Sequence, residues 1–450
     1  MRALLISTYD LGRQPFGLAS PAAWLRRESV QVTCVDTSRT DLTDEQIADA
    51  DVVAFYLPMH TATRLAEPLI ARCRSRNPAA RLVAYGLYAP LNAGWLLERG
   101  VTDVLGPEAE KELVALILSP GARVQSAGVP RLAFIQPDRR TLPPLADYAS
   151  LQLPDGARKI VGSTEASRGC KHLCRHCPIV PVYQGVFRVV PIDVVMQDVA
   201  AQVAAGAEHL SFGDPDFFNG PTHARRLVER LAIEFPGLTY DVTIKIEHLL
   251  QQRELLPVLA GTGCLFVTSA VESVDDRVLA QLAKGHTRAD FEAAVALCRD
   301  AGLAIAPTFV PFTPWTTLAG YVDLLQTIAR LELVEDVAPI QLAIRLLVTE
   351  GSRLLDLPDM QRVVGTFDPA SLTFPWSHPA PAVDALQRDV MAVVTGTAHA
   401  GRAASFGAIW DLAHERAGLV PPALNDSAAR PAAFMSEPWY CCAEPAEFHL

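Results

Sequence analysis

The chain has 450 residues, half of them hydrophobic and a fifth charged, with a formal net charge of −11 at pH 7. This length allows two or three packed domains, and the acidic balance argues against non-specific binding to nucleic acid. An apolar run of the roughly 18 residues that span a membrane is missing, and so is a secretory signal pattern, so we expect a cytoplasmic protein without membrane partners. Nine cysteines then fit ligand chemistry in a reducing compartment better than a disulfide framework.

Residues 1–125 alternate short apolar runs with segments that carry apolar residues at helical spacing. The apolar runs lie at 2–7, 30–35, 51–57, 81–87 and 102–106. Strands alternating with helices predict an α/β domain with a doubly wound parallel sheet that is buried on both faces. Ligands of such sheets bind beyond the carboxyl ends of the strands.

The loop after the first predicted strand, from Ser7 to Gly12, therefore stands where a ligand would bind. Its setting resembles the cobalamin-binding domain that precedes many radical S-adenosylmethionine (SAM) barrels. Members that ligate cobalt through the protein carry a DxHxxG motif in this loop, and here Ser7, Tyr9 and Gly12 take the places of its Asp, His and last Gly. Three interpretations stay open: cobalamin bound with Tyr9 in place of the histidine, a degenerate domain that binds none, or a plain recognition domain.

Residues 126–160 are rich in proline and lack sustained periodicity, which predicts a connector that packs along the two domains. From 161 to 355 the alternation of strands and helices resumes with a longer repeat. The expected strands lie at 159–166, 209–213, 240–246, 264–270, 303–309 and 340–347. Six such units predict a partial (β/α)6 barrel, whose chemistry belongs at the carboxyl ends of its strands.

The segment that follows the first barrel strand, SRGCKHLCRHCP at 167–178, holds three closely spaced cysteines: Cys170, Cys174 and Cys177. Thiolates at this density select iron–sulfur clusters, zinc or copper over hard cations. Three of them on one loop can hold three corners of a 4Fe–4S cluster and leave the fourth iron without a protein ligand. The alternatives are a zinc site with His172 or His176 as the fourth ligand, or buried thiols without metal.

The spacing CxxxCxxC is the signature of the radical SAM superfamily, and its place after the first barrel strand agrees with that of an active site. The chain resembles this superfamily. The resemblance implies that the open iron chelates the amino and carboxylate groups of SAM, and that the reduced cluster cleaves a carbon–sulfur bond to give a radical. It also implies an external electron donor of the flavodoxin or ferredoxin type.

Other strand ends supply candidate contacts to SAM. Gly213 and Asp214 follow the second strand, where the superfamily often has Gly-Gly-Glu, but the Glu is absent and a plain turn is the alternative. Glu272 ends the fourth strand in a run that resembles cobalamin-type radical SAM proteins, in which the Glu faces SAM; a surface ion pair is the alternative. Lys245 and Arg345 lie late in apolar strands, and we expect both at the barrel mouth, on SAM or substrate.

Residues 356–450 predict one or two helices, a Pro/Ala-rich linker and a tail that contains Cys441 and Cys442. Adjacent cysteines have Cα atoms about 3.8 Å apart, below the usual disulfide range of roughly 4.4–6.8 Å, so this pair suits redox relay or binding of a thiophilic element. A frayed tail is the alternative. The ending CCAEP resembles that of radical SAM proteins named for a CUAEP or CCAEP tail, in which the position of Cys442 can hold selenocysteine.

The sequence thus predicts a radical SAM enzyme that acts on a small-molecule or thiophilic substrate, with Cys441 and Cys442 as catalytic residues that hold a soft atom such as selenium or arsenic. Cobalamin-dependent methylation is the alternative reaction. An iron–sulfur redox sensor or electron-transfer protein is the alternative of another class.

Overall fold

The computed structural model describes residues 1–119, 129–424 and 433–437. The N-terminal domain contains a five-stranded sheet in the order β2-β1-β3-β4-β5, and every neighbouring pair is parallel. Its strands are β1 (Arg2–Ser7), β2 (Gln31–Asp36), β3 (Val52–Tyr56), β4 (Arg81–Tyr85) and β5 (Asp103–Val104). This order is that of doubly wound folds of the flavodoxin type, and it confirms the predicted parallel sheet.

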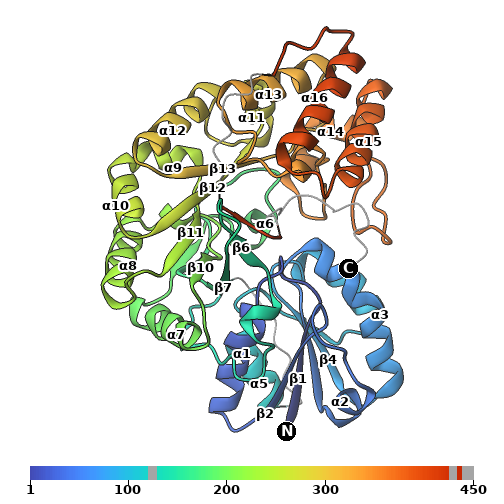
Figure 1. Cartoon of the computed structure of the whole chain (residues 1–450). Coiled ribbons are helices and arrows are strands. Elements are labelled where there is room, and N and C mark those ends of the chain that lie inside the picture. Colours follow the sequence, from blue (N-terminus) through green and yellow to red (C-terminus); the bar gives the residue numbers. More distant parts are fainter. Residues whose placement is uncertain (120–128, 425–432, 438–450) are drawn as a thin grey trace.

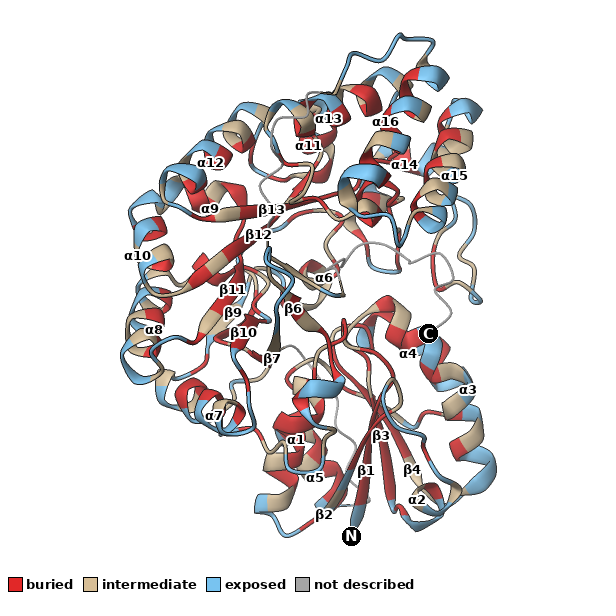
Figure 2. Ribbon diagram, viewed as in Figure 1, coloured by how far each residue is buried: buried red, intermediate tan, exposed pale blue. Residues whose placement is uncertain are grey.

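Helices cover both faces of this sheet (Figure 1). Helices α1 (Phe16–Arg27) and α5 (Glu110–Leu118) share one apolar core with it. On the other face lie α2 (Asp44–Asp49), α3 (His60–Arg76) and α4 (Ala93–Glu98). Figure 2 shows the central strands buried along most of their length, as expected for apolar strands between two helical layers.

The second domain is a curled sheet in the order β13-β12-β11-β10-β7-β6-β14, with helices on its outer side (Figure 1). Its five parallel strands are β7 (Arg158–Thr164), β10 (His209–Phe212), β11 (Thr239–Thr243), β12 (Cys264–Glu272) and β13 (Ala304–Phe309). The helices of this domain are α7 (Ile192–Ala204), α8 (Pro221–Glu234), α9 (Ile246–Gln251), α10 (Leu256–Gly261), α11 (Asp276–Leu282), α12 (Arg288–Asp300) and α13 (Leu318–Arg330). The arrangement is a half-barrel.

The prediction of a sixth strand at residues 340–347 is wrong. Residues Pro339–Leu342 form a 3-10 turn, and the only pairing nearby is an isolated bridge between Phe312 and Arg345. Pro311 and Pro314 flank Phe312, and neither residue has an N–H group to donate, so the pairing cannot extend into a ladder. The apolar side chains of this run instead fill the core beneath the C-terminal helices.

Two short strands extend the half-barrel at one edge. Strand β6 (Ser150–Gln152) pairs antiparallel with β7, and β14 (Phe434–Met435) pairs antiparallel with β6. The end of the predicted connector 126–160 is therefore part of the sheet. A separate ribbon of β8 (Ser167–Gly169) and β9 (Phe187–Val189), with α6 (Ile179–Tyr183) between them, carries the cysteine loop.

The predicted helical C-terminal region is confirmed by α14 (Pro358–Val363), α15 (Pro381–Gly396) and α16 (Arg402–Ala417). Helices α15 and α16 pack on each other and on α13, and they share the core of the half-barrel. Five further 3-10 turns complete the elements: Pro90–Asn92, Leu145–Asp147, Phe217–Asn219, Arg253–Leu255 and Arg353–Asp356. Within the described residues, no helix is both long and apolar enough to cross a membrane.

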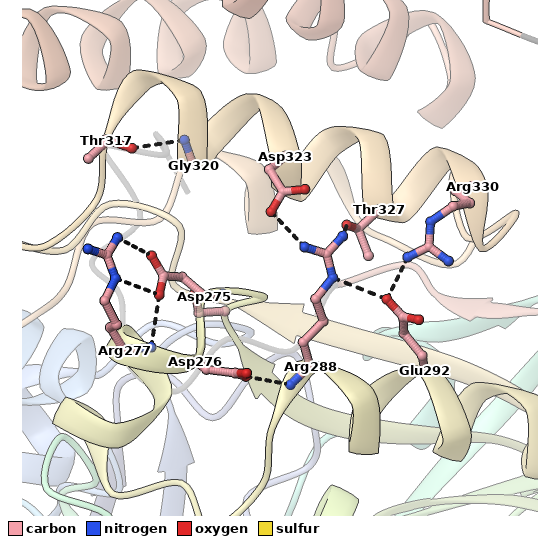
Figure 3. Close-up of polar contacts among 11 residues, drawn as sticks. Asp275, Asp276, Arg277, Arg288, Glu292, Thr317, Gly320, Asp323, Thr327 and Arg330 are labelled. Carbon is pink, nitrogen blue, oxygen red and sulfur yellow. Dashed lines mark hydrogen bonds and ion pairs between the residues drawn. The ribbon is translucent and has the colours of Figure 1, made fainter.

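A polar network ties the outer helices α11, α12 and α13 together (Figure 3). The guanidinium of Arg288, at the start of α12, donates to Asp323 at 2.8 Å and to Thr327 at 2.7 Å, both on α13. Its backbone N–H donates to Asp276 of α11 at 2.7 Å. Glu292 accepts from Arg330 one helix away at 2.5 Å. These contacts fix the helical layer that backs the strands on which the site is built.

Candidate active site

The cysteine loop begins where β8 ends. Gly169 has a φ of +76°, and a Cβ there would lie 2.4 Å from the carbonyl oxygen of Val186, so only glycine fits this turn. Cys170, Cys174 and Cys177 follow, and all three line one cavity without a disulfide among them. Burial raises the pKa of the Cys170 thiol to about 11, and ligation to a metal would offset that cost because it deprotonates the thiol. Three converging thiols are a donor set that fits three corners of an iron–sulfur cluster.

The cavity lies between the two domains, at the carboxyl ends of the strands of both sheets. On the side of the N-terminal domain its wall is largely aromatic and apolar: Phe16, Tyr56, Met59, Tyr85 and Tyr88. On the side of the half-barrel its wall is polar: Thr243, Lys245, Glu272 and Lys284, next to the cysteines. A cavity with one largely apolar wall and a few convergent charges is typical of a cofactor or substrate site.

Glu272 reaches the cavity from the last position of β12. Its φ is +71°, and the pairing of β12 with β13 shifts register between Ala270 and Glu272. The carboxylate lies 3.3 Å from Nζ of Lys284 and accepts a hydrogen bond of 3.1 Å from Nε2 of His176, which belongs to the cysteine loop. Burial would raise the pKa of Glu272, but the charge of Lys284 and the bond from His176 outweigh it and lower the pKa to about 2. An ionised carboxylate thus lines the cavity, and a contact of Glu272 with SAM stays a prediction.

Lys245 also lines the cavity, and its contact with SAM or substrate stays a prediction. Its ammonium lies 3.0 Å from Oε2 of Glu247 and 3.2 Å from Nδ1 of His172 on the cysteine loop. Three neighbours form a compact group that sequence reasoning missed: His172, Asp216 and His248, whose donor atoms lie within 4.8 Å of one another. These atoms come from the cysteine loop, the loop after β10 and helix α9, so the sequence offers no spacing from which to group them. The group has the donor types of a metal site, and Asp216 and His248 hold the cysteine loop through their contacts with His172.

Asp214 and Gly213 both line the cavity. The two carboxylate oxygens of Asp214 are engaged, since Oδ2 accepts from the N–H of Ala166 at 2.9 Å and Oδ1 from the hydroxyl of Ser167 at 2.5 Å. Burial raises the pKa of Asp214 to about 7. The residue therefore supports the strand that carries the cysteines, and a contact of Gly213 or Asp214 with SAM stays a prediction.

The expectation for Arg345 is corrected by the structure. Its guanidinium lies 2.6 Å from Asp384 and donates to the carbonyl of Trp376 at 2.6 Å, with its centre 3.6 Å from the ring of Trp376. It is not among the residues that line the cavity. Because the sixth strand does not form, Arg345 has no strand end from which to face the barrel mouth, and it ties the C-terminal region to the half-barrel instead.

Tyr9 lies beside the site and not in its wall. It is buried, and its hydroxyl donates to the carboxylate of Glu437, which also lies 3.8 Å from Arg39. The only described segment after 424 thus returns to the loop that follows β1. A role of Tyr9 in binding cobalamin stays a prediction. Cys441 and Cys442 lie outside the described residues.

Arg168 joins the two domains next to the first cysteine. Its guanidinium lies 2.7 Å from Glu110 of the N-terminal domain and 2.7 Å from Glu165 of the half-barrel. The side chains of Arg168 and Glu110 are 8% and 3% exposed. The sequence could not reveal these ion pairs, because no pattern near Glu110 or Arg168 indicates that the two segments lie together in the fold.

Comparisons with known proteins agree with this geometry. Residues 164–322 match the sequence model of the radical SAM superfamily. A curated relative, the tRNA-2-methylthio-N(6)-dimethylallyladenosine synthase of Chlorobium phaeobacteroides (strain BS1), is 23% identical over 212 residues, which cover 45% of this chain. The chain spans 44% of the length of that relative.

Two solved structures share the fold across both domains. The cobalamin-dependent SAM radical enzyme OxsB with aqua-cobalamin bound has a TM-score of 0.67 and 13% identity, with 88% of this chain and 67% of that chain covered. The radical SAM methyltransferase TsrM of Kitasatospora setae, with cobalamin and a [4Fe-4S] cluster bound, has a TM-score of 0.59 and 18% identity, with 74% and 70% covered. At these identities the likeness establishes the fold alone. Residues 164–322 therefore resemble the radical SAM superfamily, and the chain shares the fold of these two solved structures.

Proposed function

We propose that the chain is a radical SAM enzyme in which Cys170, Cys174 and Cys177 hold a 4Fe–4S cluster. The observation that carries the proposal is the convergence of these three thiols on one cavity, to which no other cysteine of the described residues contributes. Three protein ligands leave one iron of a cubane open for a small molecule. The bound cluster would supply the one-electron chemistry, and the protein supplies orientation and exclusion of water.

SAM carries both a carboxylate and two cationic groups, and the polar wall of the cavity offers partners for each. The ammonium groups of Lys245 and Lys284 suit the carboxylate of SAM, and the ionised Glu272 suits its amino group or sulfonium. Asp214 and His176 keep the strand end and the cysteine loop in place around these charges. The residues of the half-barrel thus bind and orient SAM beside the cluster.

Cobalamin-dependent methyl transfer is the second candidate reaction. It is favoured by the aromatic and apolar side chains with which the N-terminal domain lines the cavity, since they suit the apolar face of a corrin. Bound cobalamin would supply a methyl carrier. Tyr9 stands where a cobalt-ligating histidine would stand, so we expect cobalt without an imidazole ligand from this loop.

The substrate is proposed to be a small molecule or a soft atom, such as sulfur, selenium or arsenic, held by Cys441 and Cys442. The basis is the likeness of the CCAEP ending to the CUAEP/CCAEP radical SAM proteins, together with the anchoring of Glu437 on Tyr9. Four residues of extended chain span about 13 Å, which is the reach of Cys441 from that anchor.

Anaerobic reconstitution tests the central proposal. We expect one 4Fe–4S cluster per chain, an electron paramagnetic resonance signal that changes when SAM is added, and SAM cleavage products with dithionite. Replacement of any one of Cys170, Cys174 or Cys177 by Ala should abolish the cluster, whereas Cys298→Ala, in the core behind the sheet, should retain it. Stoichiometric zinc without iron after anaerobic purification would overturn the proposal.

Three further readouts separate the alternatives. Stoichiometric redox cycling without SAM turnover would favour a redox sensor over an enzyme. Failure to bind hydroxocobalamin with the cluster intact would remove methylcobalamin chemistry. A double Cys441→Ser, Cys442→Ser variant should retain the cluster and unproductive SAM cleavage but lose product by orders of magnitude, because the acceptor is no longer held at the attack distance of about 3–3.5 Å. Full activity of that variant would show that the tail is not catalytic.

A further inference from the structure

The side chains of His172, Asp216 and His248 meet beyond the carboxyl ends of neighbouring strands of the half-barrel. His172 belongs to the cysteine loop, Asp216 to the loop after β10, and His248 to helix α9, which follows β11. One donor atom from each residue, a ring nitrogen or a carboxylate oxygen, lies within 4.8 Å of the other two. These three residues are called the His–Asp group below. The group contains none of the three cysteines, so it is distinct from the proposed cluster site.

The donor atoms of the His–Asp group are buried, and two of them lack a hydrogen bond. The side chains of Asp216 and His248 are 2% and 1% exposed. Oδ1 of Asp216 accepts from the N–H of Phe218 at 3.2 Å, which leaves Oδ2 for the group. Oδ2 lies 2.6 Å from Nδ1 of His248, yet neither atom has a hydrogen bond of acceptable geometry among the described residues. Buried polar atoms rarely stay in this state, and an ion shared between them would satisfy both.

The spacing of the donors suits a small divalent ion. Nε2 of His172 lies 3.4 Å from Oδ2 of Asp216 and 3.3 Å from Nε2 of His248. A tetrahedral ion with bonds of about 2.0–2.1 Å to nitrogen and oxygen separates its ligands by about 3.3 Å. The shorter contact between Asp216 and His248 has to widen as the ion enters. Two imidazoles and one carboxylate are the donor set of catalytic zinc and non-haem iron(II) sites, which keep further positions open.

The charged neighbours of His172 are compatible with a bound cation. Nδ1 of His172 lies 3.2 Å from the ammonium of Lys245 and 3.6 Å from Oε2 of Glu247. A ring that binds an ion through Nε2 carries its proton on Nδ1, so Glu247 becomes the partner of that proton. Lys245 gives up Nδ1 but keeps its contact with Glu247 at 3.0 Å. Asp216 and Glu247 together carry two negative charges against the one positive charge of Lys245, and this balance favours a cation.

We propose that the His–Asp group binds a divalent transition-metal ion, zinc or iron(II), as a second metal site beside the cluster. His172 and Asp216 line the cavity between the domains and His248 does not, so an open position of the ion would face the cavity. There the ion would bind an oxygen, nitrogen or sulfur atom of the substrate. This role toward the substrate rests on the proposed function, whereas binding of the ion does not, because the two sites share no ligand.

Equilibrium dialysis of the cluster-loaded protein against zinc, followed by metal analysis, tests the site. We expect about one zinc per chain beside the iron of the cluster. Asp216→Asn, which keeps the shape of the side chain, and His248→Ala should each weaken zinc binding by about 100-fold or more, since loss of even a partner that only orients a ligand costs about 10- to 100-fold. His399→Ala, at an exposed histidine, is the matched control and should bind zinc like the unaltered chain.

A second measurement separates this site from the thiols. The triple variant Cys170→Ala, Cys174→Ala, Cys177→Ala should still bind zinc, and it should lose that zinc when Asp216→Asn is added. Cobalt(II) in the triple variant should show ligand-field absorption without the charge-transfer bands of a thiolate. Absence of zinc from the unaltered chain, zinc binding that Asp216→Asn and His248→Ala leave unchanged, or zinc that disappears with the three cysteines would each overturn the site. A cluster that fails to form in the unaltered chain would count against the proposed function alone, because the triple variant still reports on the His–Asp group.

Discussion

Glu272 has an unfavourable backbone conformation, and its charged carboxylate is buried. A side chain other than glycine at a φ of +71° costs on the order of 1 kcal/mol or more, and burial of a carboxylate adds to that cost. The ion pair with Lys284 and the hydrogen bond from His176 offset both. Strain of this kind is concentrated at functional sites, where the surrounding structure holds the residue in place.

We predict that Glu272→Gln weakens SAM binding and lowers the free energy of unfolding by about 3 kcal/mol, because Lys284 is left buried without a counter-charge. Equilibrium dialysis with SAM and anaerobic urea denaturation measure the two effects. Glu229→Gln, on α8, is the control, since the side chains of Glu229 and its partner Arg225 are 43% and 56% exposed and water can solvate both. An unchanged affinity for SAM in Glu272→Gln would show that this carboxylate does not face SAM.

The raised pKa of Glu108 leads us to predict that the free energy of unfolding depends on pH. Burial is the main cause that raises its pKa to about 7, despite the charges of Arg168 and Arg188 nearby. In the unfolded chain a glutamate has a pKa of about 4.3. Between this pKa and that of the folded state, the folded chain binds more protons than the unfolded chain, so stability falls as pH rises. Between pH 4.5 and pH 7 we expect the free energy of unfolding to fall by about 2 kcal/mol less in Glu108→Gln than in the unaltered chain. Urea denaturation of the apoprotein across that range measures it, and an unchanged slope would contradict the shift.

At the scale of elements, the apolar runs of the sequence predicted most of the parallel strands. The strands of the N-terminal sheet and the first five of the barrel lie within a few residues of their predicted bounds, because buried parallel strands are continuous apolar runs. The run 340–347 has the same apolar character, yet it makes one bridge, since prolines on the facing segment remove the donors. Strands β6 and β14 were not predictable, because three residues near 150 become a strand only against β7, and two residues near 434 only against β6.

The same limit explains the candidate site. The cysteine motif is local, and its spacing alone pointed to a cluster. Glu272 and Lys245 could be assigned to strand ends, which the topology brings to one edge. The group of His172, Asp216 and His248 needed the fold to become visible, as did the pairing of Arg168 with Glu110.

The polar contacts among α11, α12 and α13 should stabilise the folded chain by holding these outer helices together (Figure 3). Arg288→Ala removes contacts to Asp323, Thr327 and Glu292 at once, and we expect a loss of about 1 kcal/mol, above the value for an isolated surface pair. Urea denaturation of the apoprotein measures it. Arg277→Ala is the control: its side chain is 80% exposed and pairs only with nearby Asp275, so it should change little. Equal losses would contradict a cooperative network.

At the scale of the whole molecule, the cavity exists because two domains meet over the cysteine loop. Two of the contacts that cross this boundary matter most for the site. Glu437, after strand β14 on the half-barrel, accepts from Tyr9 of the N-terminal domain, and Arg168, beside Cys170, is paired with Glu110 across the boundary. The first contact ties the late residues of the chain to its first loop. The second is buried and sits at the root of the cysteine loop, so it couples the domain arrangement to the position of the thiols.

We predict that Arg168→Met lowers the free energy of unfolding by about 3–5 kcal/mol, because it leaves Glu110 and Glu165 buried or half-buried without their cation. Adding Glu110→Leu and Glu165→Leu should recover much of this loss, since an apolar group of similar volume needs no counter-charge. Urea denaturation of the apoprotein gives the energies, and limited proteolysis of the irregular segment 129–144 reports whether the domains separate. Arg140→Met, at a side chain 78% exposed, should change neither readout. If Arg168→Met were as stable as the unaltered chain, the buried pair would not hold the two domains together over the cysteines.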